Sequence, residues 1–214
     1  MKIFGYVSLL LLFSCQLQGN RTEPTATDTT PDRIDLQKLD TATFAGGCFW
    51  CVEASFEQIN GVAEAVSGYS GGKKSTADYR LVSSGNTNHA EAVQVYYDPS
   101  VISYETLLSI FFTAHDPTQL NRQGTDVGRQ YRSEIFYHNE EQKDLAEKKI
   151  KEIQSDFSKR VVTETSELDA FYVAEEYHQD YEKKHPNNSY IRNVSKPKID
   201  KVAKKFKSIL KNGI

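Results

Sequence analysis

Two thiols and two aromatic rings stand together in the stretch Gly47-Cys48-Phe49-Trp50-Cys51. Cys48 lies at the start of a predicted helix, where the terminal N–H groups and the helix dipole favour a thiolate and lower the pKa of the thiol. Phe49 and Trp50 offer an apolar wall for a small group such as a methyl. Since Cys51 is within disulfide reach, we predict a cysteine nucleophile for an uncharged, apolar substrate, with a second thiol to reset it.

The number of cysteines limits the kinds of cysteine site that the chain can form. The chain has three cysteines, Cys15, Cys48 and Cys51, so a domain in which Cys15 is removed or modified keeps one C-x-x-C pair. One pair excludes a disulfide framework and leaves a redox pair or half of a metal site. Four histidines show no metal-ligand spacing to the cysteines, so we expect neither a metal nor another cofactor. These histidines are His115, His138, His178 and His185.

An apolar run over residues 3–13 follows Lys2 and precedes Ser14-Cys15. The run is too short to span a bilayer as a mature helix and suits a secretion signal. A Leu/Phe/Ser stretch ending in cysteine also resembles the lipobox of bacterial lipoproteins, in which the cysteine becomes the lipidated first residue. We therefore expect a lipoprotein-type signal peptide over residues 1–14 and lipidation at Cys15. A plain signal peptide with a coincidental cysteine is the alternative.

Residues 15–39 are rich in Thr, Pro and Asp, and so few apolar side chains cannot offset their ordering entropy. We expect a flexible tether there, which holds a domain over residues 40–214 to a membrane through the N-terminal lipid anchor. The expected location is a bacterial cell envelope, lipid-anchored or periplasmic. The formal net charge of −3 gives no electrostatic reason to expect nucleic acid as a partner.

The elements that position Cys48 follow from hydrophobic periodicity. Residues 41–45 alternate as a strand, Gly46-Gly47 turns the chain, and apolar residues at spacings of three and four predict a helix from Cys48 that ends before Gly61. Further strands are predicted over residues 62–69, 92–97, 133–138 and 161–165, and further helices over 103–114, 139–157 and 199–211.

The remaining segments complete the fold prediction. Residues 115–132 have no clean period, which is typical of functional or mobile segments. The last helix has a lysine-rich face, which we interpret as solvated rather than as a membrane contact. We expect an α+β fold, a single two-layer α/β sandwich domain with a mixed sheet covered by helices.

Five sequence blocks occur in a recognisable order and spacing. They are Gly46-Gly47-Cys48-Phe49-Trp50, Gly68-Tyr69-Ser70-Gly71-Gly72, His89-Ala90-Glu91-Ala92-Val93, residues 126–133 and residues 174–181. Together they resemble the peptide methionine sulfoxide reductase A family over roughly residues 41–190. The resemblance implies an α+β sandwich that reduces the S epimer of methionine sulfoxide, free or in proteins.

The resemblance implies that Cys48 is the nucleophile and Glu91 the general acid. A sulfoxide sulfur is electrophilic, so a thiolate can attack it if another group protonates the departing oxygen. That group must be protonated near neutral pH, and burial beside Phe49 and Trp50 would raise the pKa of Glu91 accordingly. Without the resemblance, Glu91 would be interpreted as an exposed carboxylate at the start of a strand.

Substrate contacts are implied at further positions. Tyr79 and Tyr131 match hydroxyl donors to the sulfoxide oxygen, and Asp126 matches a carboxylate of the same pocket. Phe49 and Trp50 match the wall that receives the methyl group. By themselves, the tyrosines would be interpreted as packed side chains and the two aromatic residues as ordinary core.

The tail departs from the family pattern. Many members carry a recycling cysteine there, whereas this tail reads Pro186-Asn187-Asn188-Ser189-Tyr190. Cys51, where glycine is common in the family, is the remaining candidate. We predict that Cys51 resolves the sulfenic acid of Cys48 as a disulfide, which a thioredoxin-like donor then reduces. Alternatively, Cys51 only packs and an external thiol reduces Cys48 directly.

The expected substrates are oxidised proteins or free methionine sulfoxide, and the protein is expected to act as a monomer. Two other functions stand against this prediction. A thioredoxin-type thiol–disulfide oxidoreductase would also use Cys48 and Cys51, but Trp50 lies between the cysteines rather than before them. A non-enzymatic surface lipoprotein that binds peptides through its aromatic groove would not depend on Cys48.

Overall fold

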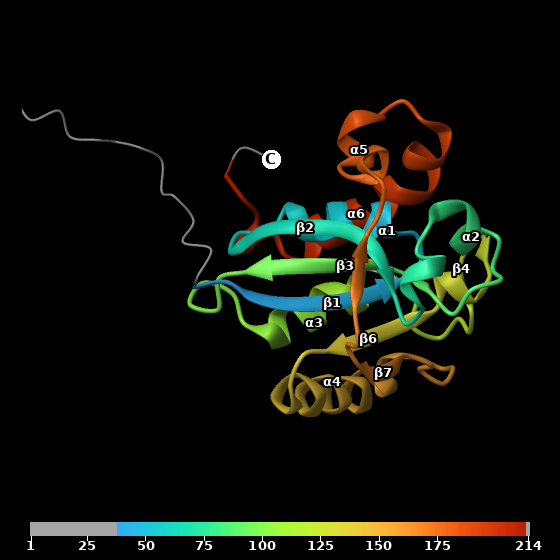
Figure 1. The fold of residues 1–214 in the computed structure, drawn as a ribbon. Helices are drawn as coiled ribbons and strands as arrows, with labels where there is room; N and C mark the ends of the chain where they lie inside the picture. The colour runs from blue at the N-terminus through green and yellow to red at the C-terminus, as the bar shows by residue number, and fades with distance from the viewer. Residues whose placement is uncertain (1–37, 213–214) are drawn as a thin grey trace, which may run out of the picture. The chain divides into compact units, whose positions relative to one another are not determined.

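A six-stranded mixed sheet runs through residues 38–212, the part of the chain that this computed structural model describes (Figure 1). The strand order is β7-β6-β1-β3-β2-β8, and every pair is antiparallel except β6 and β7. The predicted mixed sheet is confirmed. The strands are β1 (Asp40–Gly46), β2 (Val62–Ser70), β3 (Ala90–Tyr97), β6 (Ser133–Tyr137), β7 (Glu164–Glu167) and β8 (Phe171–Val173).

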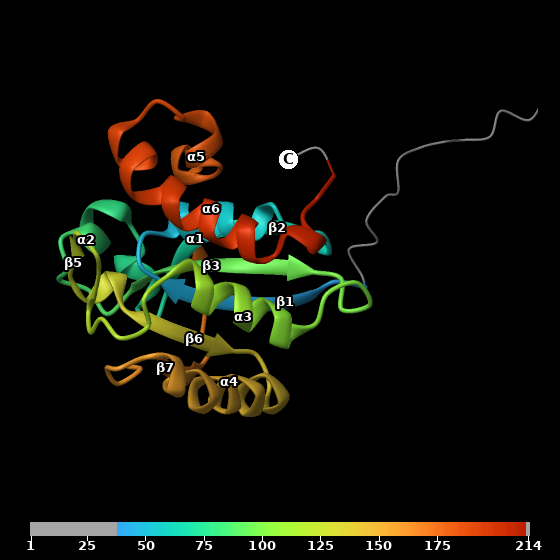
Figure 2. The same cartoon turned by 180° about the vertical axis from the view of Figure 1, so that it is seen from behind.

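Three helices cover one face of the sheet: α1 (Phe49–Glu57), α3 (Tyr104–Ala114) and α6 (Lys196–Lys205). They contact one another, and Figure 2 shows α3 and α6 lying across this face. A fourth helix, α4 (Glu140–Ile153), lies beside β6 and β7 at one edge.

The sheet divides the core between its two faces. Phe44 of β1 points toward the helices, where its ring stacks on those of Phe56 and Phe111 at centroid distances of 5.3 and 5.0 Å. The next residue, Ala45, points to the other face, where small side chains pack with Phe136 and Phe171. The fold is therefore the expected two-layer α+β sandwich, because successive strand residues alternate between faces.

Short elements gather at the end of the sheet where β1 meets α1. They are α2 (Tyr79–Ser83), α5 (Tyr181–Lys184) and a hairpin of β4 (Arg122–Gln123) and β5 (Asp126–Val127). Single helical turns complete the chain at Lys74–Thr76, Arg129–Tyr131, Gln154–Asp156, Glu176–His178, Ile191–Ser195 and Lys207–Ile209. The segment predicted to lack a period, residues 115–132, thus contains a small hairpin and one turn.

The structure shifts several predicted boundaries. The strand expected over residues 161–165 begins at Glu164, and the helices expected over 139–157 and 199–211 are shorter or displaced toward the N-terminus. The expected signal peptide, Cys15 and nearly all of the tether lie outside the described residues. No helix within residues 38–212 is long and apolar enough to cross a membrane.

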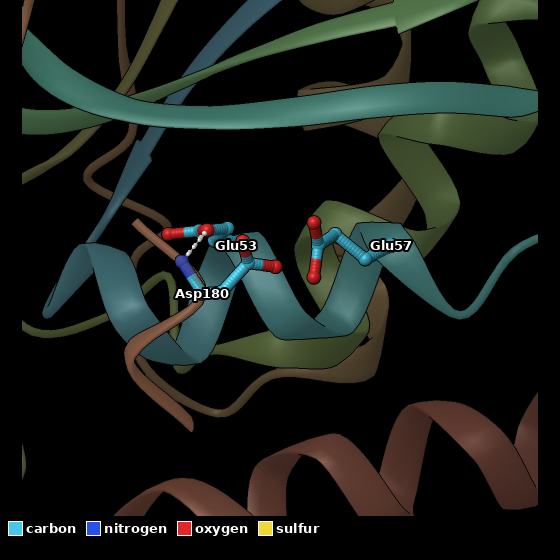
Figure 3. A group of neighbouring side chains, drawn as sticks. All are labelled: Glu53, Glu57 and Asp180. Carbon is cyan, nitrogen blue, oxygen red and sulfur yellow. Dashed lines mark hydrogen bonds between the residues drawn. The ribbon is translucent and has the colours of Figure 1, made fainter. Parts of the chain in front are cut away.

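A buried carboxyl ties α1 to the sheet and to the C-terminal segment (Figure 3). Glu53 is 2 % exposed; its carboxyl accepts a hydrogen bond from the Ser67 hydroxyl of β2 and one from the Asp180 N–H at 2.6 Å. Glu57 and Asp180 lie nearby, and both pair with Lys183 Nζ, at 2.7 and 2.9 Å. Since Lys183 already neutralises these carboxylates, we interpret the acidic group as a structural anchor.

We predict that Glu53→Gln makes stability less dependent on pH. Burial raises the pKa of Glu53 to about 7, so its folded-state pKa lies above the unfolded value of about 4.3. Its stabilising contribution is complete below the unfolded pKa and is lost as pH rises through 7. Between pH 5 and pH 8 the parent should lose roughly 2 kcal/mol of unfolding free energy relative to the variant. Denaturant unfolding under reducing conditions measures this difference.

The matched control is Glu176→Gln, because the Glu176 side chain is 92 % exposed. Its unfolding free energy should follow that of the parent at every pH. Parallel curves for the parent and Glu53→Gln would contradict the assignment.

Candidate active site

A tight turn places Cys48 at the start of α1. Gly47 has φ +94°, and a Cβ atom there would lie 2.6 Å from Gln123 Cβ, so both the backbone and the space require glycine. Cys48 is the N-cap residue of α1, its side chain makes no capping hydrogen bond, and it is 5 % exposed. The Cys51 N–H donates to the Cys48 carbonyl at 3.1 Å, so both thiols belong to the first helical turn.

Glu91 of β3 faces the same helix end. Its carboxyl is 2 % exposed and accepts a hydrogen bond from the Phe49 N–H, with 3.1 Å between N and Oε2. Burial raises the pKa of Glu91 to about 8, although the hydrogen bond opposes the shift. Glu91 is therefore a buried, protonated acid at neutral pH, as the resemblance implied, and not an exposed carboxylate.

The two thiols affect each other's pKa, and the thiol with the lower pKa is Cys51 rather than Cys48, the one predicted. The pKa of Cys51 is lowered to about 7, mainly by its hydrogen bond with Cys48. Burial raises the pKa of Cys48 well above the ordinary value. The expectation of a lowered Cys48 pKa was wrong, because burial desolvates the thiol and Cys51 raises its pKa further, while the N–H of Phe49 is bonded to Glu91. In the resting pair the first negative charge lies on the Cys51 side.

The polar residues predicted for the substrate meet around these groups. Burial, followed by the charges of Glu91 and Cys48, raises the pKa of both Tyr79 and Tyr131, so both phenols stay protonated donors near the acid and the thiol. Asp126 of the β4–β5 hairpin raises the pKa of Glu91 further. The structure thus brings together residues from four segments: the start of α1, α2, β3 and residues 126–131.

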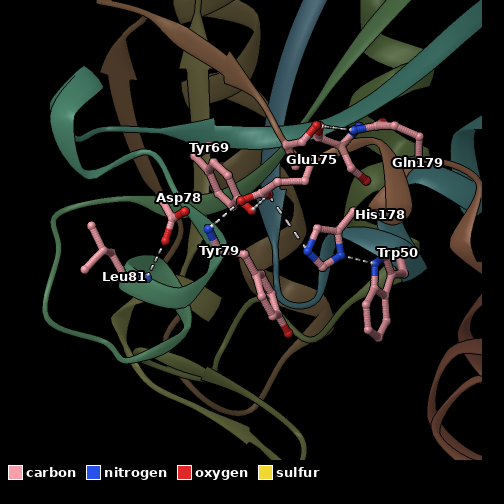
Figure 4. A network of polar contacts seen from close by, with 10 residues as sticks. Trp50, Tyr69, Asp78, Tyr79, Leu81, Glu175, His178 and Gln179 are labelled. Atoms are coloured by element: carbon pink, nitrogen blue, oxygen red, sulfur yellow. Dashed lines mark hydrogen bonds and ion pairs between the residues drawn. The ribbon is translucent and has the colours of Figure 1, made fainter.

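Trp50 is held in place by the segment that follows β8 (Figure 4). Its ring stacks on Tyr181 with centroids 3.8 Å apart and planes 8° apart. Its Nε1–H donates to His178 Nδ1 at 3.1 Å, so the proton of that imidazole is on Nε2. Burial lowers the pKa of His178, which keeps the ring neutral. Phe49 lies behind, with its centroid 5.0 Å from that of His178 and the side chain 1 % exposed.

The same segment fixes Tyr79. Glu175 accepts from the Tyr69 hydroxyl at 2.8 Å and from the Tyr79 N–H at 2.9 Å. Gln179 donates to the carbonyl of Ser67 and accepts from its N–H, at 3.0 and 2.9 Å. Residues 174–181, called the strap below, therefore fix Trp50 and Tyr79 together.

Sequence reasoning missed several residues of this site. Tyr190 donates to Asp126 Oδ2 at 2.5 Å, and its interaction with Cys48 lowers the pKa of that thiol against the effect of burial. His178 and Tyr181 lie in a block that was quoted but given no role. The block over residues 174–181 could have marked His178 and Tyr181 as candidates, whereas no periodicity or spacing pointed to Tyr190.

The fold and the site define a cysteine-dependent oxidoreductase, with a buried carboxyl and a buried thiol at the same helix end. A family model described as peptide methionine sulfoxide reductase matches residues 40–210, and the chain belongs to this family of enzymes. The peptide methionine sulfoxide reductase MsrA of Pasteurella multocida is 55 % identical over 170 residues, covering 79 % of this chain and 98 % of that protein. The MsrA of Natronomonas pharaonis is 53 % identical over 168 residues, covering 78 % and 94 %.

Solved structures agree with this assignment. Reduced Mxr1 from Saccharomyces cerevisiae superposes with a TM-score of 0.66 at 37 % identity, covering 71 % of this chain and 88 % of that one. Methionine sulfoxide reductase A of Corynebacterium diphtheriae superposes with a TM-score of 0.64 at 32 % identity, covering 71 % and 77 %. The thioredoxin-type and non-enzymatic interpretations are therefore set aside.

We predict that one thiolate titrates near pH 7 in the reduced protein. Absorbance at 240 nm reports thiolate, and a Cys15→Ser background leaves only the Cys48–Cys51 pair. The parent should gain one thiolate with a midpoint near 7, because the hydrogen bond from Cys48 stabilises the charge on Cys51. Adding Cys51→Ser should remove this step. A first midpoint near 9 in the parent would contradict the charge distribution.

Proposed function

We propose that this protein, acting as a monomer, reduces methionine-S-sulfoxide, free or in proteins, at Cys48. The observation that supports it is the protonated carboxyl of Glu91, held by the Phe49 N–H beside a buried thiol. The thiolate of Cys48 attacks the sulfoxide sulfur, and Glu91 donates its proton to the oxygen. The oxygen passes to Cys48 as a sulfenic acid, so that the thiol is oxidised by two electrons and methionine is released.

The thiol pair supplies the nucleophile although Cys48 itself ionises poorly. Because the two thiols share a hydrogen bond, proton transfer to Cys51 produces the Cys48 thiolate without a solvent base. The two forms titrate as one system. The reaction therefore needs only the less populated form, in which Cys48 carries the negative charge. Proton transfer from Cys48 to Cys51 restores this form as it reacts.

The surrounding residues orient the substrate in this proposal. The hydroxyls of Tyr79 and Tyr131 donate to the sulfoxide oxygen, and the methyl group packs on Trp50 with Phe49 behind it. Asp126, whose Oδ2 accepts from Tyr190 at 2.5 Å, lines the same pocket and fixes the Tyr190 hydroxyl. A sulfoxide of one handedness satisfies the donors, the acid and the wall together, which is the basis for the preferred epimer.

Recycling runs through Cys51 in this proposal. The Cys51 thiolate attacks the sulfur of the sulfenic acid, a disulfide forms, and hydroxide leaves as water after taking a proton. A thioredoxin-like dithiol then reduces the disulfide by exchange and is itself oxidised. The placement of both cysteines on one helical turn supports this step.

We further propose that the protein works in a bacterial cell envelope, secreted by residues 1–14 and lipidated at Cys15. The apolar run ending in Ser14-Cys15 and the polar stretch after it support this location. In a bacterial host, the full chain should partition into detergent with the membrane fraction, whereas Cys15→Ala should be released into the aqueous phase. Equal partitioning of both would favour a plain signal peptide or none.

We predict that Glu91→Gln lowers turnover at pH 7 by a factor of about 100 or more, because proton donation to the oxygen is lost. In the parent, turnover should fall as pH rises through about 8, since Glu91 loses its proton there. Steady-state assays from pH 6 to 9 measure both effects. Alkylation of Cys48 should persist in the variant, and exposed Glu64→Gln on β2 is the matched control. Near-normal turnover of Glu91→Gln would remove Glu91 from the acid role.

A single turnover without added reductant tests the reaction as a whole. In a Cys15→Ser background, one equivalent of S-sulfoxide should give one methionine and the loss of two thiols per protein. With Cys51→Ser added, methionine should still form with a sulfenic acid left on Cys48. If the parent forms methionine but loses only the Cys48 thiol, Cys51 merely packs. If no methionine forms, the proposed function fails.

A further inference from the structure

The resolving cysteine is enclosed by the C-terminal segment. The Cys51 thiol donates to Ser195 Oγ at 3.0 Å, with Cys51 2 % exposed and Ser195 fully buried. Ser195 ends a π-helical turn, Ile191–Ser195, that leads directly into α6. Such turns break the regular α-helical spacing and are frequent at functional sites. Here the turn brings one hydroxyl against a reacting sulfur.

A lysine three residues later adds a positive charge. Lys198 Nζ is buried, and it has no hydrogen-bond partner among residues 38–212. Its charge, after the hydrogen bond from Cys48 and against burial, lowers the pKa of Cys51. An ammonium group without a partner is costly to bury, so a nearby negative charge would stabilise it. The thiolate of Cys51 provides that charge.

The other charged groups near Cys51 are accounted for. Asp126 of β5 opposes a negative charge on Cys51, and Glu91 of β3 does so only after it loses its proton near pH 8, whereas burial keeps Tyr190 protonated. On the far side of Lys198, burial lowers the pKa of His115 to about 4, so its ring is neutral. The Asp116 carboxylate, which borders the same cavity as Lys198, already accepts hydrogen bonds from neighbouring residues. Lys198 is thus available to Cys51.

We propose that Ser195 and Lys198 stabilise the Cys51 thiolate, which makes Cys51 both the attacking thiol in disulfide formation and the leaving thiol in recycling. This rests on the proposed resolving role of Cys51. In the first step Cys51 sulfur bonds to Cys48 sulfur and the S–O bond breaks, with hydroxide leaving as water. In the second, a donor thiolate bonds to Cys48 sulfur, the disulfide breaks, and its electron pair leaves on Cys51. The donor's second thiol then completes the exchange.

The effect on rate has a distinct dependence on pH. Removing either group should raise the pKa of Cys51 by about one unit, which lowers the thiolate fraction about tenfold at pH 6. The more basic thiolate is about threefold more nucleophilic. Disulfide formation should therefore be about threefold slower at pH 6 in each single variant and about tenfold slower in the double variant. Near pH 9 the difference should vanish or reverse.

The experiment separates the two steps of one turnover. Ser195→Ala, Lys198→Met and the double variant are made in the full chain with Cys15→Ser, and an S-sulfoxide is mixed with the reduced protein. Quenched samples give methionine by chromatography and free thiols by titration, from pH 6 to 9. Rates are expressed relative to the parent at each pH, so that titration of Glu91 cancels. Reduction of the preformed disulfide by dithiothreitol is followed in parallel.

Two variants serve as controls. Ser195→Thr keeps a hydroxyl beside Cys51 and should restore most of the rate that Ser195→Ala loses. Lys196→Met removes an equal charge from the same helix, where Lys196 is 60 % exposed and pairs with Asp200. It should match the parent at every pH.

We expect thiol loss and disulfide reduction to slow at pH 6 while formation of methionine is not slowed. Equal slowing of methionine formation and thiol loss, or a relative rate of thiol loss that is constant from pH 6 to 9, would overturn the inference and indicate a packing role. If the parent loses two thiols per methionine and the variants match it, only this inference fails. If the parent loses one thiol, the proposed resolving role fails first and the inference fails with it.

Discussion

The hydrogen bond from the Phe49 N–H to Glu91 determines how the rest of the site is used. A helix N-terminus favours negative charge, so a thiol at that position is expected to have a lowered pKa. In this protein the first N–H points at a carboxyl from the central strand β3 instead. Burial still outweighs that bond and keeps the carboxyl protonated. The acid is thus fixed in direction by the helix and kept in its neutral form by the core.

Because the Phe49 N–H at the helix end is bonded to Glu91, a thiolate must be stabilised by other groups. Cys48 lies in a desolvated position and holds its proton. Cys51 contacts the Ser195 hydroxyl at 3.0 Å, and the charge of Lys198 lowers the pKa of its thiol. Separate elements therefore hold the two groups: β3 carries the protonated carboxyl of Glu91, and the turn that ends at Ser195 contacts Cys51. The strap, residues 174–181, orients the uncharged side chains of Trp50 and Tyr79.

The sequence predicts the framework of this arrangement better than its details. Period-two and period-3.6 patterns locate β1, α1, β2, β3 and α3. Ser103 and Asn139 cap α3 and α4 by accepting from the N–H groups of Thr106 and Gln142. The edge strand β7 is misplaced because Thr165 and Ser166 are held by parallel pairing with β6 rather than by apolar alternation. Resemblance of ordered blocks points to Cys48 and Glu91, but Ser195 meets Cys51 across 144 residues of chain. Such contacts arise only from tertiary packing and leave no local signal.

The placement of both thiols on the first turn of α1 has a consequence for the oxidised protein. A cross-link restricts the unfolded chain in proportion to the logarithm of the loop that it closes. A disulfide between Cys48 and Cys51 would close one of the shortest loops available, whereas a cysteine in the tail would close a loop of most of the domain. By the same relation, the short loop stabilises the oxidised protein by about 2 kcal/mol, against about 5 kcal/mol for a loop of about 150 residues. A Cys48–Cys51 disulfide would therefore couple catalytic oxidation to global stability only weakly, and each turnover would undo a smaller stabilisation than a cross-link to the tail would bring.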